Sequence, residues 1–549
     1  MIVGDVNIET NRLKKKDSTK KNNFTTQLKD YFTEYSENSG IHGIKYLGEQ
    51  NRTISEKIWW FIALLAALYL CVTLIIRTYQ KWESSPVIVS FATKETPIWQ
   101  IPFPAVTICP ETKSLPTAFN YTDMLYKKLQ NRPVTEDEEL KFSYIASLCT
   151  YHPELTYNLN DFVDAENMFE FLEKVSPKFL ENISDCFYMG HAYNCSDIFT
   201  PIVTDEGLCY AFNLLNREDI LSDTVLHYNN YHSLTKYRAE WSLEHGYKNS
   251  AGKNTYPRRA LHAGALFDFE LKIQTLDNEL DFTCGSSIQG YKIQIHHPAM
   301  LPRVKQQHFR IPLDQAVIAA TMPTMIQTSE AVKSYKPERR QCYFPSERNL
   351  KYFKIYTQQN CQIECKTNYT LKVCGCVDFY MPREKGTKIC GAPLKVCMQE
   401  AEDQLLSEGI ETNIRHVQGL QVKNDILHQT INKCDCMPEC TSMTYIVENS
   451  QSEWDWVRKY QFDPEYSQFN KSKMHMSYLQ VFFKGNQFIT SERNELYGPT
   501  DFLANFGGLL GLFTGFSLLS SVEILYYLSL RLICNIKLYG IRYWSGKHE

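Results

Sequence analysis

The sequence has little excess charge of either sign and no recognisable catalytic motif. Its 549 residues include 58 Lys and Arg against 62 Asp and Glu, which gives a net charge of −4 and a pI of about 6.4. Nucleic-acid-binding proteins usually present a basic patch, so this balance argues against one. No nucleophile elbow, zinc-protease helix, P-loop or dinucleotide-binding fingerprint occurs in a suitable context, and no histidine spacing indicates a metal site. We therefore expect that the protein is not an enzyme, and that it has no catalytic residue, no metal ion and no resident cofactor.

Long apolar runs are scarce too. Charged residues form 22% of the chain and apolar residues 43%, with a mean hydropathy of −0.36, which excludes both a disordered chain and a polytopic transporter. Ile58–Ile76 has 19 residues without a charge and would extend roughly 28 Å as a helix, close to the thickness of the hydrocarbon core. Phe502–Leu530 has 29 residues with one charge, Glu523, and is too long for a buried helix of a soluble protein. We predict membrane spans at residues 58–77 and 501–533.

Two spans place both ends of the chain on one side of the membrane. Residues 1–57 contain ten Lys and Arg, and residues 534–549 are basic as well. Short basic flanks favour the cytoplasm, so we expect a multi-pass protein with both tails cytoplasmic and residues 78–500 extracellular. The mixed-charge N-terminal tail is expected to be loose until about Ser39.

The cysteines agree with an extracellular middle segment. Of the 18 cysteines, Cys71 lies in the first predicted span and Cys534 follows the second, while the other 16 fall between Cys109 and Cys440. Disulfides persist outside the cell and are rare inside it. Zinc is the alternative, and the reduced compartment that it needs argues against it. Ten cysteines crowd into residues 342–440, which predicts a small subdomain held by disulfides, although spacing alone leaves their pairing open.

Sequons also mark the middle segment as extracellular, although such triplets are frequent by chance. The expected glycosylation sites are Asn120, Asn182, Asn194, Asn368 and Asn470.

Periodicity in the same segment predicts both helices and strands. Residues 160–182 have apolar side chains at helical spacing until Pro177, and residues 101–110, 282–297 and 304–327 read mostly as strands. We expect a mixed α+β extracellular domain.

The second span combines glycines with an acid. Gly507, Gly511 and Gly515 repeat every four residues, which can serve close helix packing. Such packing does not explain Glu523, because a carboxylate in a span costs about 2.5–3.5 kcal/mol and normally faces a partner or water. Neither apolar run, Ile58–Ile76 or Phe502–Leu530, contains a Lys or Arg that could pair with Glu523, so a water-filled cation path is the better hypothesis.

Geometry adds a condition to this hypothesis. On a straight helix Gly515 and Glu523 are about 80° apart, so a break near Gly515–Ser517 is needed for both to approach one axis. Carbonyl groups of such a break can ring a cation. Because two spans cannot enclose a pore, several subunits would have to meet around an axis.

Several short stretches stand in a fixed order within the two-span frame: Ile41-His42-Gly43, Phe103–Cys109, Gly207–Asn213, Gly290–His296, the cysteines from Cys342 to Cys440, and Gly507–Ser517 followed by Glu523. In these stretches the chain resembles the degenerin/epithelial sodium channel family, and its insect pickpocket branch most of all.

The resemblance implies a plasma-membrane channel of three identical or related subunits, favouring Na⁺ and blocked by amiloride, in a sensory or epithelial setting. The extracellular domain would be a clenched hand around a β-core, opened by a stimulus or ligand that the sequence does not identify. The selectivity belt would consist of Gly515, Phe516 and Ser517, and Glu523 would provide a negative electrostatic potential in the pore. His42, Gly43 and Ala504 would serve gating. Phe516 departs from the small residue common at its position, which leaves selectivity for sodium over potassium open.

The resemblance also implies a disulfide pattern. The implied pairs are Cys109/Cys209, Cys186/Cys195, Cys342/Cys440, Cys361/Cys436, Cys365/Cys434, Cys374/Cys397 and Cys376/Cys390, and the two cysteines left over, Cys149/Cys284, are predicted to bond to each other.

A different class of function fits the same two spans. The chain could be a non-conducting surface protein for binding or adhesion, or an accessory subunit, with two anchors in contact with membrane lipid. An inert anchor has no need of Glu523 among glycines, and this residue favours the channel hypothesis.

Overall fold

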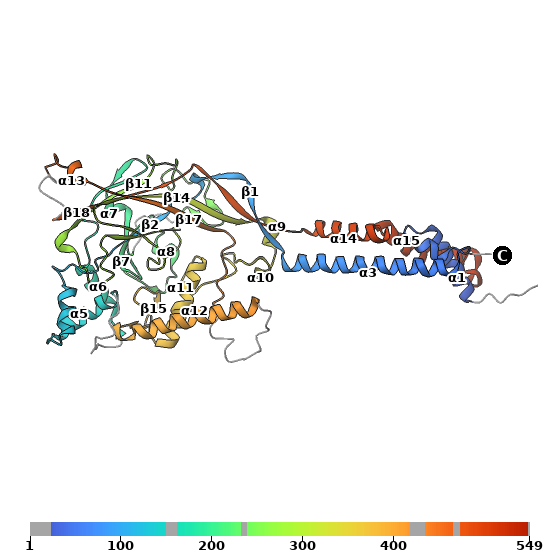
Figure 1. Cartoon of the computed structure of the whole chain (residues 1–549), viewed down its shortest axis with the longest axis horizontal. Helices are drawn as coiled ribbons and strands as arrows, with labels where there is room; N and C mark the ends of the chain where they lie inside the picture. The colour runs from blue at the N-terminus through green and yellow to red at the C-terminus, as the bar shows by residue number, and fades with distance from the viewer. Residues whose placement is uncertain (1–23, 150–161, 232–238, 418–433, 465–472, 547–549) are drawn as a thin grey trace, which may run out of the picture. The chain divides into compact units, whose positions relative to one another are not determined.

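The computed structural model describes residues 24–149, 162–231, 239–417, 434–464 and 473–546 (Figure 1). The chain forms two compact units. The first, which we call the helical unit, consists of Met1–Ile88 and Glu495–Glu549. The second, the disulfide-rich unit, consists of Val89–Asn494.

The first apolar run lies in α3 (Ile54–Ser84), a helix of 31 residues. It begins with a reciprocal cap, in which the Thr53 hydroxyl accepts the Glu56 N–H and the Glu56 carboxylate accepts the Thr53 N–H. The helix therefore starts four residues before the predicted span of 58–77 and ends seven residues beyond it, because polar flanking residues continue the helix.

The second apolar run is not one helix. It consists of α14 (Pro499–Thr514), α15 (Leu518–Leu528) and α16 (Leu530–Tyr539). The predicted span of 501–533 covers α14, α15 and the start of α16, and the tail predicted from 534 begins inside α16. Figure 1 shows α14 and α15 alongside α3. By length and apolar character, Ile54–Ser84 and Leu518–Tyr539 are the two candidate membrane spans.

Two helices precede α3, and the first of them lies in the stretch expected to be loose until about Ser39. They are α1 (Phe24–Asn38) and α2 (Ile44–Gly48). A Cβ added at Gly48 would lie 1.7 Å from the Ser36 Oγ, so glycine permits the close approach of α2 to α1. The expectation failed because aromatic residues of α1 pack within the helical unit, a tertiary contact that local composition does not reveal.

The disulfide-rich unit contains two main β-sheets. The larger has eight strands in the order β1 (Val87–Pro97), β19 (Gln487–Glu495), β14 (Gln315–Thr328), β18 (Met474–Phe483), β11 (Phe269–Leu276), β4 (Ile183–Tyr188), β5 (His191–Tyr193), with β17 (Ser442–Glu453) paired to β14. The second has the order β13 (Phe309–Ile311), β12 (Tyr291–His296), β2 (Ala105–Pro110), β7 (Gly207–Phe212), β6 (Phe199–Thr204).

The two sheets share an apolar core. The Phe212 ring of β7 stacks on the Phe269 ring of β11 with centroids 4.2 Å apart, which joins one sheet to the other. β14 runs parallel to β18, with Val317 opposite Leu479 and both side chains buried. Gly290 precedes β12 at φ +116°, and an added Cβ would lie 2.1 Å from the Ile311 carbonyl oxygen, so only glycine fits there.

The rest of the disulfide-rich unit is mainly helical. The bounds of its helices and strands can be compared with those predicted from the sequence. The long ones are α4 (Tyr121–Leu129), α5 (Glu136–Ala146), α6 (Ala165–Val175), α11 (Gln358–Cys374) and α12 (Lys395–Val417). The helix predicted within 160–182 is confirmed as α6, which ends just before Pro177. The strands predicted at 101–110 and 304–327 are confirmed in part as β2, β13 and β14. The strand predicted at 282–297 is limited to β12, since a turn held by the Asp281 carboxylate precedes it.

Short elements complete the unit. They are α7 (Cys195–Ile198), α8 (Arg217–Ile220), α9 (Glu330–Lys333), α10 (Pro337–Arg340), α13 (Trp456–Lys459), β3 (Phe162–Val163), β8 (Val225–Leu226), β9 (Trp241–Ser242), β10 (Gly246–Tyr247), β15 (Arg383–Glu384) and β16 (Ile389–Cys390).

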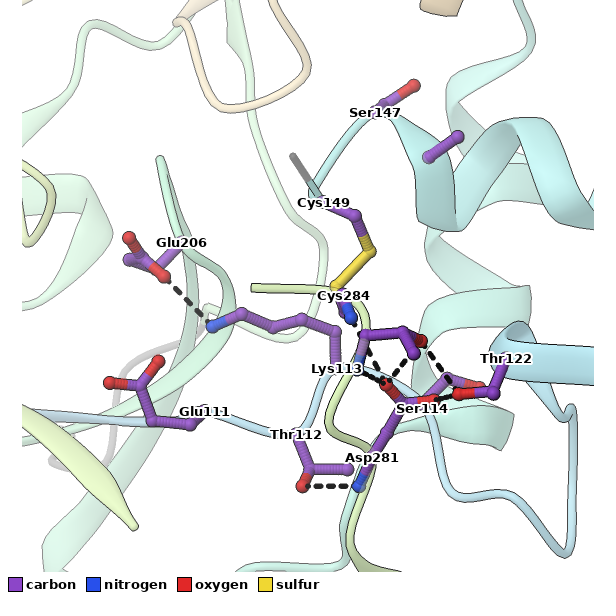
Figure 2. Close-up of a disulfide and its surroundings, with 12 residues drawn as sticks. Glu111, Thr112, Lys113, Ser114, Thr122, Ser147, Cys149, Glu206, Asp281 and Cys284 are labelled. Atoms are coloured by element: carbon purple, nitrogen blue, oxygen red, sulfur yellow. Dashed lines mark hydrogen bonds and ion pairs between the residues drawn. A yellow bond between two sulfur atoms is a disulfide. The ribbon is translucent and has the colours of Figure 1, made fainter. Parts of the chain in front are cut away.

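The sixteen cysteines between Cys109 and Cys440 form eight disulfides in the structure. They are the seven pairs implied by the resemblance and the predicted pair Cys149–Cys284. Figure 2 shows this last bond beside a turn in which Asp281 Oδ1 accepts the N–H groups of Thr283 at 2.8 Å and Cys284 at 3.1 Å. The bond thereby ties the chain after α5 to the turn before β12. Cys71 and Cys534 are free.

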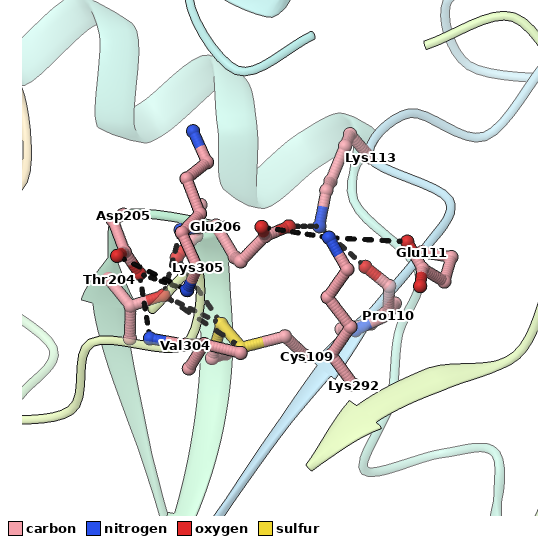
Figure 3. Close-up of polar contacts among 12 residues, drawn as sticks. Cys109, Pro110, Glu111, Lys113, Thr204, Asp205, Glu206, Lys292, Val304 and Lys305 are labelled. Carbon is pink, nitrogen blue, oxygen red and sulfur yellow. Dashed lines mark hydrogen bonds and ion pairs between the residues drawn. A yellow bond between two sulfur atoms is a disulfide. The ribbon is translucent and has the colours of Figure 1, made fainter. Parts of the chain in front are cut away.

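A buried ionic cluster lies beside the Cys109–Cys209 bond (Figure 3). Glu206 accepts from Lys113 Nζ at 3.0 Å and from Lys292 Nζ at 2.8 Å. Glu111 accepts from Arg310 Nε at 2.8 Å and lies 3.5 Å from Lys292 Nζ. These ion pairs connect β2, the turn before β7, β12 and β13, and they fix the second sheet from within.

Candidate functional site

The candidate site is the break between α14 and α15, residues 515–517, which we call the helix break. Gly515 has φ +67°, a left-handed conformation that ends α14, and its N–H donates to the Gly511 carbonyl at 2.9 Å. Ser517 then caps α15: its Oγ accepts the Ser520 N–H at 3.3 Å, and its own N–H donates to the Ser520 Oγ at 3.2 Å. The interruption expected near Gly515–Ser517 is present, and it leaves backbone carbonyl groups outside regular helix hydrogen bonding.

Residues 39–43, here called the His-Gly loop, lie against this break. The His42 N–H donates to the Thr514 carbonyl at 2.9 Å, which satisfies one of the last carbonyl groups of α14. A Cβ added at Gly515 would lie 2.8 Å from His42 Nδ1, so the imidazole occupies the space that any larger residue would need. Two motifs more than 470 positions apart in the sequence are therefore in direct contact.

Gly43 gives the loop its course. It has φ +89°, which favours glycine, and an added Cβ would lie 3.1 Å from the Leu64 Cδ1 of α3. The loop therefore passes close to α3 before α2 begins at Ile44.

Glu523 contacts the same loop. Its Oε2 accepts the Gly40 N–H at 3.1 Å, and its side chain is half-buried on α15. Neither apolar run contains a Lys or Arg that could pair with Glu523. In the structure its partner is the backbone N–H of Gly40, which occupies one of the two carboxylate oxygens, Oε2.

One face of α14 carries only small residues. Ala504, Gly508 and Gly511 lie within about 60° of one another around the helix axis. A Cβ added at Gly507 or Gly508 would meet no atom within 4 Å, so this face is open in the single chain.

The opposite face of α14 packs on α3. There the Phe502 ring lies 5.3 Å from the Trp82 ring and stacks on the Phe506 ring, with both phenylalanines about 160° from Ala504 around the axis. Since α3 packs behind α14, the small-residue face is left for other contacts.

The structure thus brings together most of the predicted functional residues of the spans. Gly515, Phe516, Ser517, Glu523, His42 and Gly43 belong to one cluster, whereas Ala504 lies eleven residues earlier, roughly 16 Å along the helix. Sequence reasoning missed Gly40, Thr514 and Ser520. The Ser517-x-x-Ser520 spacing is a capping signal that could have identified Ser520, but Gly40 and Thr514 act through backbone groups that have no sequence signature.

The predicted sequons lie on the disulfide-rich unit. Asn120, Asn194 and Asn368 are exposed and Asn182 is half-buried, while Asn470 lies outside the described residues. Within the described ranges, no group of three or more His, Cys, Asp or Glu side chains could hold a metal ion.

Comparisons with known proteins bear on this arrangement. A family model described as the amiloride-sensitive sodium channel matches residues 35–527, which include the His-Gly loop, the helix break and the whole disulfide-rich unit. Pickpocket protein 28 of Drosophila melanogaster is 29% identical over 516 residues, covering 91% of this chain and 78% of that protein.

Two further relatives are similar to this chain over most of its length. Sodium channel protein Nach of Drosophila melanogaster is 25% identical over 530 residues, covering 94% of this chain and 90% of that protein. Human acid-sensing ion channel 2 is 23% identical over 512 residues, covering 90% and 85%. A solved proton-activated chloride channel covers 86% of this chain and 96% of that chain at 8% identity, but its TM-score of 0.27 is too low to inform the fold.

Proposed function

Because the chain belongs to the amiloride-sensitive sodium channel family, whose members are ion channels and not enzymes, we propose that it is a subunit of a sodium-favouring, amiloride-sensitive cation channel. Three copies, or this chain with related subunits, would meet in the plasma membrane with both tails in the cytoplasm. The disulfide-rich unit would lie outside the cell, where its rigidity would transmit a stimulus or the binding of a ligand to the spans.

The observation that carries this proposal is the helix break with the His-Gly loop against it. Left-handed Gly515 interrupts a membrane-spanning stretch and frees carbonyl oxygens, which is tolerated at membrane depth only where the backbone lines a wet cavity or is buried in protein. In the proposed assembly the carbonyl oxygens of Gly515 and Phe516 replace part of the hydration shell of Na⁺. Ser517 completes the belt as the cap of α15, and its own carbonyl accepts the Ser521 N–H at 3.3 Å. Glu523, one turn into α15, raises the local concentration of cations.

The small-residue face of α14 supports the position of the pore axis. Since α3 packs behind α14, the face of Ala504, Gly508 and Gly511 would line the axis where three copies meet. A bulky side chain at Ala504 would then prevent close approach of the three α14 helices and hold the path open.

Voltage clamp of cells expressing this chain alone tests the proposal. We expect a cation current that amiloride blocks, and Ala504→Phe should raise the resting current several-fold while Leu503→Phe, the same ring at the neighbouring exposed position, should not. Ser517→Ala or Glu523→Gln should change the reversal potential or unitary conductance.

Surface labelling must show equal amounts of each variant. Absence of any current from chains at the surface, alone and with related subunits, would contradict the channel and leave a tethered binding protein.

A further inference from the structure

A cluster of side chains holds α1 against α15, α16 and the segment that follows them. We call this cluster the α1 clamp; its members are Tyr31, Glu34 and Tyr35 from α1, and Tyr527, Arg531 and Trp544.

An ion pair is the polar part of the clamp. Glu34 Oε1 accepts from Arg531 Nη2 at 2.6 Å and from Arg531 Nε at 3.0 Å. Two of the five N–H donors of the guanidinium thus converge on one carboxylate oxygen, and both side chains are about two-thirds buried or more. This geometry is more restrictive than that of a solvent-exposed ion pair on a helix surface.

Aromatic contacts form the rest of the clamp. The Tyr31 hydroxyl donates to the Tyr527 carbonyl, and the Tyr31 ring lies 5.5 Å from the Trp544 ring. The Tyr35 ring meets the Tyr527 ring edge-on at 5.3 Å. Such pairs stabilise beyond the area that they bury, so α1 is bound along successive turns.

The clamp is directly connected to the His-Gly loop. α1 ends at Asn38, and the next residues include Gly40, whose N–H reaches Glu523, and His42, whose N–H reaches Thr514. So short a loop has little slack, and the position of α1 determines whether these two hydrogen bonds can form. We propose that the α1 clamp is a positioning device: the C-terminal segment holds the His-Gly loop on the helix break.

The consequence for ion flow rests on the proposed function. If residues 515–517 and Glu523 line the pore, release of the clamp frees Glu523 from Gly40 and leaves the Thr514 carbonyl uncapped, which changes the ionic path. The contact between the His-Gly loop and the helix break, however, can be tested without measuring any current.

Ser520 offers a direct measure of loop release. Its side chain is 3% exposed, and a Cβ at Gly40 would lie 3.5 Å from its Oγ, so the loop covers it. A cysteine at this position reacts with a thiol reagent in proportion to the fraction of time that the loop is away. The probe is a maleimide applied to the cytoplasmic face of membranes that contain the full chain with Ser520→Cys and Cys534→Ser.

We expect Glu34→Arg or Arg531→Glu to raise the rate of Ser520→Cys modification up to about fivefold, the factor that corresponds to a well-formed ion pair. The exchanged pair Glu34→Arg with Arg531→Glu should return the rate to within about twofold of the original. Trp544→Ala, which changes no charge, should raise the rate as well.

Three controls match these variants. Glu37→Arg on α1 and Lys537→Glu on α16 make the same charge changes at exposed positions and should leave the rate unchanged. A cysteine at Leu538, 71% exposed, reports reagent access and should react equally in all backgrounds.

The result that would overturn the proposal is a rate that neither clamp variant raises above the Glu37→Arg control, or a rise that the exchanged pair fails to reverse. Recordings of the ratio of sodium to potassium permeability in the same variants test the proposed function separately. A chain that carries no current in any background contradicts the channel but leaves the labelling result decisive for the clamp.

Discussion

Glu206 shows how a single buried carboxylate is kept ionised in the disulfide-rich unit. Burial by itself would raise its pKa, but the attraction of Lys113 and Lys292 outweighs burial and lowers the pKa to about 2 (Figure 3). The ordinary pKa of a glutamate side chain, which the unfolded chain is expected to show, is 4.5. The contribution of Glu206 to stability is therefore complete above about pH 4.5 and is lost as the pH falls toward 2, since the unfolded state then binds the proton more readily.

Replacing Lys113 should expose this dependence. Lys113→Met leaves the Glu206 carboxylate with Lys292 alone, and we expect a loss of about 3 kcal/mol in the free energy of unfolding at pH 7. Thermal unfolding of the detergent-solubilised chain between pH 7 and pH 3 measures the effect, which should shrink as the pH falls. Lys174→Met, which removes an exposed ion pair with Glu170, is the control and should leave the transition unchanged. Equal transitions for both variants would show that the buried pairing does not stabilise this sheet.

Two buried histidines also make the fold less stable in acid, and their effect begins at a higher pH than that of Glu206. Burial lowers the pKa of His296 to about 4 and that of His297 to about 3, so both rings are neutral in the folded chain. A histidine that must stay neutral stabilises the fold above its unfolded pKa of 6.5 and ceases to do so as acid protonates the unfolded state. These two rings therefore belong to the packed sheet.

At the scale of elements, the helix break depends on the conformation of one residue. Gly515 combines a positive φ with the imidazole of His42 at the place of a Cβ, whereas Gly507 lies inside α14 with open space around it. The two glycines are chemically identical and differ in backbone conformation and in the space around them.

Alanine at these two positions should give opposite results. Gly515→Ala should cost about 1–2 kcal/mol in the left-handed conformation and push His42 aside, with loss of current or altered selectivity. Gly507→Ala should strengthen α14 by roughly 0.5–1 kcal/mol and preserve selectivity. Reversal potentials under voltage clamp decide between them; the same potentials in both variants would remove the break from the ion path.

At the scale of the whole chain, disulfides join segments that are distant in the sequence. Cys149 and Cys284 are 135 residues apart, and their bond fixes the chain after α5 to the turn before β12 (Figure 2). The pair Cys342–Cys440 spans 98 residues in the same way. The eight disulfides act mainly on the unfolded state of the unit, because closed loops reduce its conformational entropy, and the bonds that close long loops reduce it most.

Removal of the Cys149–Cys284 bond tests this view. Cys149→Ser and Cys284→Ser should each lower the free energy of unfolding by about 2–5 kcal/mol, and the double variant should equal either single one, because one bond is lost in every case. Thermal unfolding and mass mapping of thiols provide the measurements. A free thiol at either position in the unaltered chain, or additive losses, would refute the pair.

Much of the architecture could be predicted from the residues because it rests on local signals. Charge-free length predicted α3, proline placement predicted the end of α6, and an even count of cysteines predicted disulfides. α1 was missed because its stability comes from Tyr527 and Trp544, more than 490 positions away. A break in the second apolar run was expected near Gly515–Ser517, but the left-handed conformation of Gly515 and the contact with His42 are visible only in the folded chain.

Composition and spacing alone indicated two apolar runs long enough to cross a membrane, a disulfide-rich segment between them, and an acid among glycines, since each of these follows from neighbouring residues. Folding in three dimensions decided what Glu523 and Thr514 bind. Their partners are the backbone N–H groups of Gly40 and His42, and a backbone group looks the same in every residue. Only the path of the chain can bring such groups together, and here that path depends on α1 being held in place.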